Sequence, residues 1–277
     1  MVSSLRIESA EQAMQNPEYL TALKELLFQV ADDDFILAHR GSEWLGLAPH
    51  IEEDVAFSSM SQDMMGHAVM FYEMLEALGA GKADDLAQLR KPEDFRNAVL
   101  VERMNGTGDY IEEPHYDWAY AIARCYFYGL FKEVRSESLA NSSYLPLAQV
   151  SRKTMTEHRY HMIHWQVWMS QLANSTEEAR NRLANALGKV WDDIGGLFIL
   201  GPLAASIVKH GLIEGEELLT QRWLEKAKKA FDTFGLTWIG KPKTPELNGR
   251  AGQHTQELAD AIDTLSEVYR LDPAANW

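Results

Sequence analysis

Hydrophobic residues recur at steps of three and four along most of this chain, which is the spacing of one face of an α-helix. Two long helices are predicted in the first third, over residues 18–45 and 51–78. The first carries its apolar side chains at Leu20, Leu23, Leu26, Leu27, Val30 and Leu37. Both are followed by residues that end helices, namely Gly46, Pro49, Gly79 and Gly81.

Helical spacing returns in the rest of the chain. Further helices are predicted over residues 116–136, 145–172, 177–194, 216–234 and 255–269. The long connection before residue 116 is different in character. It combines a short helix near 84–90, a strand-like run at 98–102 and a turn at Asn105-Gly106.

The four longest predicted helices have about 20–28 residues, against a mean of about 11–12 in globular proteins. Long amphipathic helices with one long connection between them predict an all-α, ferritin-like four-helix bundle with additional C-terminal helices. No linker rich in proline, glycine or serine divides the chain, so we expect residues 1–277 to form a single domain. Residues 1–17 are expected to be an irregular N-terminal extension.

The composition limits the classes of partner and the cell compartment that fit this chain. The chain has 26 basic and 41 acidic residues, a net charge of −15, and so acidic a surface repels nucleic acid. The single cysteine, Cys125, allows no intramolecular disulfide, which suits a reducing cytoplasm. The N-terminus lacks the apolar core of a signal peptide, and no run approaches the ~18–20 apolar residues of a membrane helix. We therefore expect a cytoplasmic protein without a membrane or nucleic-acid partner.

Two acid–histidine pairs interrupt the apolar faces of the long helices. Asp63 and His67 are four residues apart on the second helix, and Glu157 and His161 are four apart on the fourth. Three aspartates, residues 32–34, also lie between apolar positions of the first helix. Charges on a core-facing stripe need partners, because burying an unpaired charge is costly. We expect both pairs to lie in the bundle interior.

A dimetal centre is one interpretation of these residues. Carboxylate-bridged sites in such bundles take a Glu from each of two helices and a Glu-x-x-His motif from each of the other two. Here the acid–histidine spacing is four, and Gly66 and Tyr160 stand at the three-residue positions. Residues 126–131, in the middle of the third helix, contain no carboxylate, and Glu133 lies too near the helix end.

These departures favour a degenerate or empty metal site at Asp63, His67, Glu157 and His161, with no catalytic residue in this chain. The alternatives are a complete redox-active centre and some other metal arrangement. Simple ion pairs within or between helices would also satisfy the same side chains.

Seven segments, taken in order, resemble one protein family. They are residues 39–46 (HRGSEWLG), 48–54 (APHIEED), 63–68 (DMMGHA), 121–127 (AIARCYF), 157–161 (EHRYH), 249–255 (GRAGQHT) and 276–277 (NW). Their order and spacing resemble the structural subunit of the bacterial phenylacetyl-CoA epoxidases, which are ring 1,2-monooxygenases. The likeness runs from about Val30 to Trp277, whereas residues 1–29 do not fit the pattern. His67 also stands where relatives are expected to carry a glutamine.

The resemblance implies a function that the residues do not show by themselves. Complexes of that family use dioxygen to convert the ring of phenylacetyl-CoA into a 1,2-epoxide. Their dimetal iron centre lies in a homologous catalytic subunit, and a reductase with flavin and an iron–sulfur cluster passes electrons from NADPH. The structural subunit resembled here holds no cofactor and supports the catalytic one, in a complex with other small subunits and the reductase. When the catalytic subunit is absent, this chain is expected to be able to associate with further copies of itself.

Three functions are therefore compared. The first is a non-catalytic subunit of an epoxidase acting in aerobic phenylacetate catabolism. The second is a dimetal-carboxylate oxidase or oxygenase in its own right, and the third is an unrelated helical scaffold bundle. Metal analysis separates the first two, and co-purification with a ligand-complete bundle subunit separates the first from the third.

Overall fold

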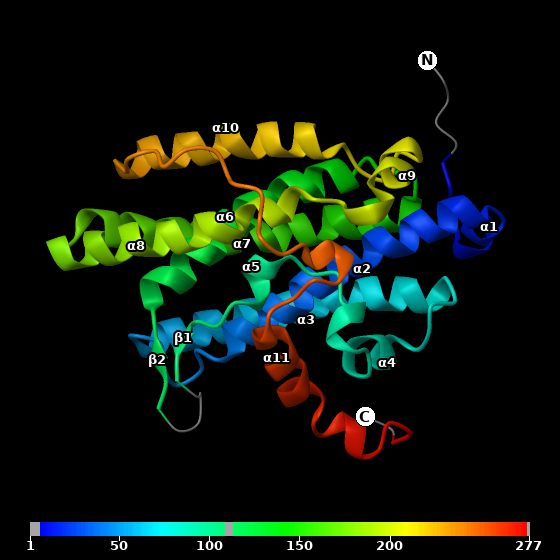
Figure 1. Cartoon of the computed structure of the whole chain (residues 1–277), viewed down its shortest axis with the longest axis horizontal. Coiled ribbons are helices and arrows are strands. Elements are labelled where there is room, and N and C mark those ends of the chain that lie inside the picture. Colours follow the sequence, from blue (N-terminus) through cyan, green and yellow to red (C-terminus); the bar gives the residue numbers. More distant parts are fainter. Residues whose placement is uncertain (1–5, 109–112, 276–277) are drawn as a thin grey trace.

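Two helical hairpins form the centre of the computed structural model, which describes residues 6–108 and 113–275. The first hairpin consists of α2 (Pro17–Ser42) and α3 (Ile51–Ala77), and the second of α6 (Trp118–Leu139) and α7 (Leu145–Asn174). The hairpins pack together in one bundle (Figure 1). The all-α, ferritin-like four-helix bundle predicted from the sequence is confirmed.

Side-chain caps explain where the long helices begin. The Asn16 side chain accepts a hydrogen bond from the backbone N–H of Tyr19 at the start of α2, and Pro17 occupies the first turn. The Asp117 side chain accepts from the backbone N–H of Tyr120 at the start of α6. Both caps satisfy donors that have no partner within the helix, and proline at the first turn loses none.

Shorter elements cover the bundle. They are α1 (Ala10–Met14), α4 (Ala83–Gln88), α5 (Val99–Glu102), α8 (Glu177–Asp193), α9 (Ala204–Lys209), α10 (Glu216–Phe234) and α11 (Gln256–Ser266), with 3-10 turns at Pro92–Asp94, Ile194–Phe198, Gly201–Leu203, Gly249–Ala251 and Tyr269–Leu271. The helices α8 and α10 pack on α6, whereas α11 extends from the bundle beside α4 (Figure 1). The additional C-terminal helices are thus confirmed.

The length and hydropathy of the helices bear on membrane crossing. Among the described residues, no single helix is long and apolar enough to cross a bilayer. One bent pair, Glu177–Phe198 with Gly201–Lys209, meets the length and composition criteria only when its two parts are taken together.

The connection between the hairpins departs from its prediction. The run expected to be strand-like forms one helical turn, α5, whose four residues are all buried. The predicted turn at Asn105-Gly106 is replaced by an antiparallel pair, β1 (Gly106–Thr107) with β2 (His115–Tyr116). The apolar run of residues 98–101 suits a strand or one turn of helix equally, so periodicity could not decide.

The N-terminal extension also differs from its prediction in the part that the structure describes. Helix α1 lies there, capped by the Ser9 side chain, which accepts from the backbone N–H of Gln12. Ile7 forms a bridge to Tyr144, at the start of α7. Ile7 therefore attaches this segment to the second hairpin, and α1 packs on α2 of the first, so residues 6–17 are not irregular.

Candidate functional site

Three consecutive aspartates of α2 lie in the bundle interior, and each is paired with at least one buried or partly buried cation. The side chains of Asp32, Asp33 and Asp34 are fully buried. Successive residues of a helix point about 100° apart, so the three carboxylates face three directions. Asp32 binds the guanidinium of Arg90 at 3.0 Å, and Tyr72 donates to it at 2.6 Å.

Asp33 lies between two arginines from distant parts of the chain. Arg250 donates to both carboxylate oxygens, at 2.9 and 2.8 Å, and Arg135 of α6 donates at 2.5 Å. The backbone N–H of Ala98 adds a fourth bond at 2.8 Å. Arg250 belongs to one of the segments that carry the family resemblance, and its place beside Asp33 gives that segment a structural role.

Asp34 begins a chain of contacts that crosses the bundle. The ammonium of Lys132 on α6 lies 2.7 Å from Asp34 Oδ2 and 3.1 Å from Nδ1 of His67 on α3. The other ring nitrogen, Nε2 of His67, lies 2.6 Å from Glu157 Oε2 on α7. Since an ammonium can only donate, Nδ1 accepts and Nε2 donates to the carboxylate. Tyr128 donates to the second oxygen of Asp34 at 2.9 Å.

The charges of this cluster favour a neutral His67. Burial and the Lys132 ammonium lower the pKa of His67, and together they outweigh the nearby carboxylates. Burial also lowers the pKa of Lys132, although Asp34 opposes it, and burial alone would raise the pKa of Asp34. The cations Lys132 and Arg135 nevertheless hold the pKa of Asp34 below its ordinary value. The result is a lysine–aspartate ion pair linked to a neutral imidazole.

The two predicted acid–histidine pairs are exchanged between helices. His67 pairs with Glu157 at 2.6 Å and His161 with Asp63 at 2.9 Å, so each contact joins α3 to α7. Only the histidines are buried, whereas the Asp63 and Glu157 side chains are 41% and 44% exposed. The expectation that all four lie in the interior is therefore wrong for the carboxylates. Asp63 and Glu157 lie instead at the rim of the bundle, on the sides of α3 and α7 that are turned toward solvent.

This geometry changes which residues correspond to a Glu-x-x-His motif. The histidines, and not the acids, face the interior, so the positions to compare are those three residues before them. These positions hold Met64 and His158. His158 is buried, and its Nε2 donates to the carbonyl of Gly129 at 2.8 Å. This hydrogen bond holds the imidazole against α6. Neither motif therefore offers a carboxylate.

The residues present do not fit a dimetal centre. The Lys132 ammonium lies between the buried carboxylate of Asp34 and the buried imidazole of His67. A divalent cation next to this ammonium would meet a like charge. Among residues 6–108 and 113–275, no group of three His, Cys, Asp or Glu side chains is arranged to hold a metal ion.

Lys132 is the residue that sequence reasoning missed. It lies in a run of aromatic and aliphatic side chains on α6, next to Phe131 and three residues before Arg135. Two cations on a buried helix face must meet buried anions, and Asp32 to Asp34 are the acidic run of α2 that could supply them. These two sets of opposite charges on apolar helix faces would have predicted the contact between α6 and α2.

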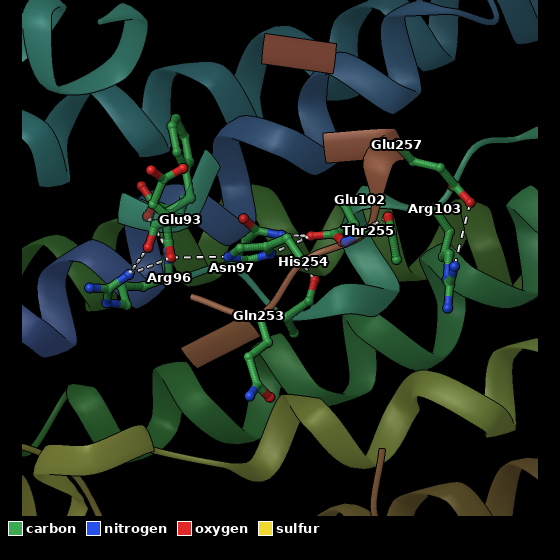
Figure 2. A network of polar contacts seen from close by, with 12 residues as sticks. Glu93, Arg96, Asn97, Glu102, Arg103, Gln253, His254, Thr255 and Glu257 are labelled. Carbon is green, nitrogen blue, oxygen red and sulfur yellow. Dashed lines mark hydrogen bonds and ion pairs between the residues drawn. The ribbon is translucent and has the colours of Figure 1, made fainter. Parts of the chain in front are cut away.

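A second polar network fixes the C-terminal segment (Figure 2). The carboxylate of Glu102, fully buried, accepts from Nδ1 of His254 at 2.7 Å and from the backbone N–H of Thr255 at 2.7 Å. The side chains of Asn97 and Thr255 add two further bonds. Residues 249–255 thus connect to α2 through Arg250 and to α5 through His254, whereas residues 276–277 of the resemblance lie outside the described residues.

The fold and the site define a class, a ferritin-like bundle whose polar centre is neutralised by its own side chains. The family described as "Phenylacetic acid catabolic protein" matches residues 5–277, and the chain belongs to that family. It is also 26% identical, over 259 residues, to one of the subunits of the 1,2-phenylacetyl-CoA epoxidase of Escherichia coli (strain K12). That similarity covers 93% of the chain and 100% of the relative. The resemblance found in the sequence is confirmed.

Proposed function

We propose that this chain is the structural, non-catalytic subunit of a multicomponent oxygenase that epoxidises phenylacetyl-CoA in aerobic phenylacetate catabolism. The family and the similarity to an epoxidase subunit support the assignment to such a complex. The observation that supports the non-catalytic role is the Lys132 ammonium, 2.7 Å from Asp34 and 3.1 Å from His67. A lysine between these groups supplies the positive charge that a metal would otherwise bring.

The chemistry would take place in other components of the complex. A homologous catalytic subunit would carry the iron, and the flavin, the iron–sulfur cluster and NADPH would belong to the reductase. This chain would contact that catalytic subunit directly and would work in the cytoplasm with the other small subunits. It would have no cofactor of its own.

The buried ion pairs give this chain a physical means of support. Lys132 joins α6 to α2 and α3, and Arg135 joins α6 to α2 again. Removing one member of such a pair leaves a buried charge alone and typically costs about 3–5 kcal/mol. Helices α2, α3 and α6 therefore resist sliding past one another. A bundle held so firmly can fix the position of helices on a partner that docks against it.

Co-expression with the catalytic subunit tests the proposal. We expect the two chains to purify as one complex in which iron is present at about two equivalents per catalytic chain and none is assignable to this chain. Separation of the subunits under mild conditions, followed by elemental analysis of each, gives the distribution. Purification of the catalytic subunit free of this chain, or iron retained by this chain after separation, would contradict the proposal.

A further inference from the structure

Four oxidisable aromatic rings lie in a row across one end of the bundle, outside both polar networks. Each ring meets the next edge-to-face. The ring centroids are 5.7 Å apart between Tyr116 and Trp44, 5.0 Å between Trp44 and Trp118, and 5.0 Å between Trp118 and Trp168. These residues belong to β2, the turn after α2, the start of α6, and α7. We call the four residues the aromatic row.

Packing alone does not explain the two central tryptophans of the row. A buried indole N–H usually has an acceptor, because leaving a buried donor without one destabilises the fold. The Nε1 atoms of Trp44 and Trp118 are buried, and no atom of the described residues accepts a hydrogen bond from either. Phenylalanine would supply a similar apolar ring without that cost. Another property of the indole must therefore favour tryptophan at these two positions.

A second group of tryptophans in this chain differs in this respect. Nε1 of Trp191 on α8 donates to the carbonyl of Gly240 at 3.0 Å. Nε1 of Trp223 on α10 donates to the carbonyl of Phe127 at 3.1 Å. These two indoles act as ordinary anchors, apolar in body and hydrogen-bonded at the nitrogen. The aromatic row is thus distinguished by its unpartnered N–H groups and not by the presence of tryptophan.

An indole without a proton acceptor suits the movement of an electron without a proton. Among aromatic side chains, indole and phenol give up one electron readily, whereas the phenyl ring of phenylalanine does not. The radical cation of an indole normally loses its N–H proton to the nearest acceptor, and the oxidation is then trapped at that ring. Trp44 and Trp118 have no such acceptor among the described residues. Each would keep its proton and take an electron from the next ring instead.

We propose that the aromatic row is a path for one-electron oxidation through this end of the bundle. A one-electron oxidant removes an electron from Trp168 and is itself reduced. The Trp168 radical cation takes an electron from Trp118, which in turn takes one from Trp44. Trp44 then takes an electron from Tyr116, whose phenol releases its proton to the solvent. One phenoxyl radical and three restored indoles remain.

The exposure of the rings agrees with such a path. Its two ends, Trp168 and Tyr116, are partly exposed, whereas Trp44 is only 3% exposed. Oxidants and reductants in solution therefore reach the ends, and the surrounding side chains shield the centre. Under the proposed function, the oxidant would be a one-electron oxidant formed when dioxygen activation in the complex misses its substrate. The path goes beyond that function and can be tested on this chain alone.

A photosensitiser beside Trp168 tests the path in the full-length chain. Gln171 is exposed and follows Trp168 by three residues, so Gln171→Cys places a ruthenium polypyridyl label next to that ring. Cys125 does not compete for the label, because burial raises the pKa of its thiol to about 11. A light flash with an electron acceptor in solution converts the label into the one-electron oxidant. Electron paramagnetic resonance then detects the radical, and mass spectrometry of its spin-trap adduct locates it at Tyr116.

Phenylalanine substitutions interrupt the row in the labelled protein. Trp118→Phe and Trp44→Phe each remove one oxidisable ring and no hydrogen bond. We expect each to lower the yield of the Tyr116 radical at least tenfold. Trp165→Phe is the matched control, since Trp165 lies on α7 like Trp168 but outside the row, and it should change the yield less than twofold. Thermal unfolding checks that every variant is folded, and two row variants keep the test decisive if one of them is not.

The possible results decide the inference independently of the proposed function. An undiminished Tyr116 radical in Trp118→Phe and Trp44→Phe would overturn it, because the oxidation would then reach the phenol by another route. Oxidation of Trp168 in the labelled protein without any radical at Tyr116 would overturn it as well. Failure of this chain to join an epoxidase complex would contradict the proposed function and would leave the path unaffected.

Discussion

The ammonium of Lys132 and the carboxylate of Asp34 form an ion pair of 2.7 Å in the centre of the bundle, with side chains 4% and 0% exposed. Lys132 also donates to the imidazole of His67, so three helices meet at one positive charge. The pair is almost completely removed from water, and its stabilising effect depends on both members being present.

Removal of the lysine charge should therefore be severe. We expect Lys132→Ala to lower the free energy of unfolding by about 3–5 kcal/mol, because Asp34 is left buried without its nearest cation. Lys209→Ala is the control, since Lys209 forms an exposed pair with Glu18 and should change stability by less than about 0.5 kcal/mol. Urea unfolding of both variants gives the comparison, and equal effects would mean that the buried pair has no special role.

Truncation of Glu157 should be mild by comparison. Its side chain is 44% exposed and its partner His67 is neutral, so Glu157→Ala strands no buried charge. We expect a loss of about 1 kcal/mol, the usual effect of one hydrogen bond. A loss above about 3 kcal/mol in urea unfolding would show that the carboxylate is buried in solution, contrary to the structure.

Acid should destabilise the protein through its buried histidines. Burial lowers the pKa of His158 to about 3, and the Lys132 charge adds to this effect. The unfolded state, with a pKa near 6.5, then binds more protons than the native state, so stability is full above pH ~6.5 and falls as the pH drops toward 3. At pH 5 the low pKa of His158 reduces the free energy of unfolding by roughly 2 kcal/mol relative to its value at neutral pH. His158→Gln can still donate to Gly129, and it should reduce the loss of stability between pH 7 and pH 5 in thermal unfolding. An unchanged pH profile would contradict this assignment.

Iron should bind poorly to the chain on its own. We expect less than one equivalent after anaerobic incubation with ferrous iron and desalting, because Lys132 adds a positive charge between Asp34 and His67. Elemental analysis measures the ratio directly. Two tightly bound irons per chain would revive the alternative of an independent dimetal oxidase.

The bundle was predictable because its helices are long and strongly patterned. α3, predicted over 51–78, is observed at Ile51–Ala77, and α10 is observed at Glu216–Phe234 as predicted. The run at 98–102 has a strand-like sequence but forms a helical turn, because its conformation depends on packing against α2, which periodicity does not contain.

The site was less predictable than the fold. Spacing along a helix places Asp63 and His67 on one side but does not say which of them points inward or which helix supplies the partner. The exchanged pairs follow from how α3 and α7 lie against each other, a property of tertiary packing. The rotation that buries both histidines leaves both carboxylates at the rim.

In the proposed function, this chain supports a reaction that it does not perform. The most direct measurement is the turnover of phenylacetyl-CoA by the catalytic subunit, with reductase, NADPH and dioxygen, in the presence and absence of this chain. We expect no turnover by this chain without the catalytic subunit, little by the catalytic subunit alone, and full activity when both are present in equal amounts. Equal turnover without this chain, or oxidation of the thioester by this chain alone, would contradict it.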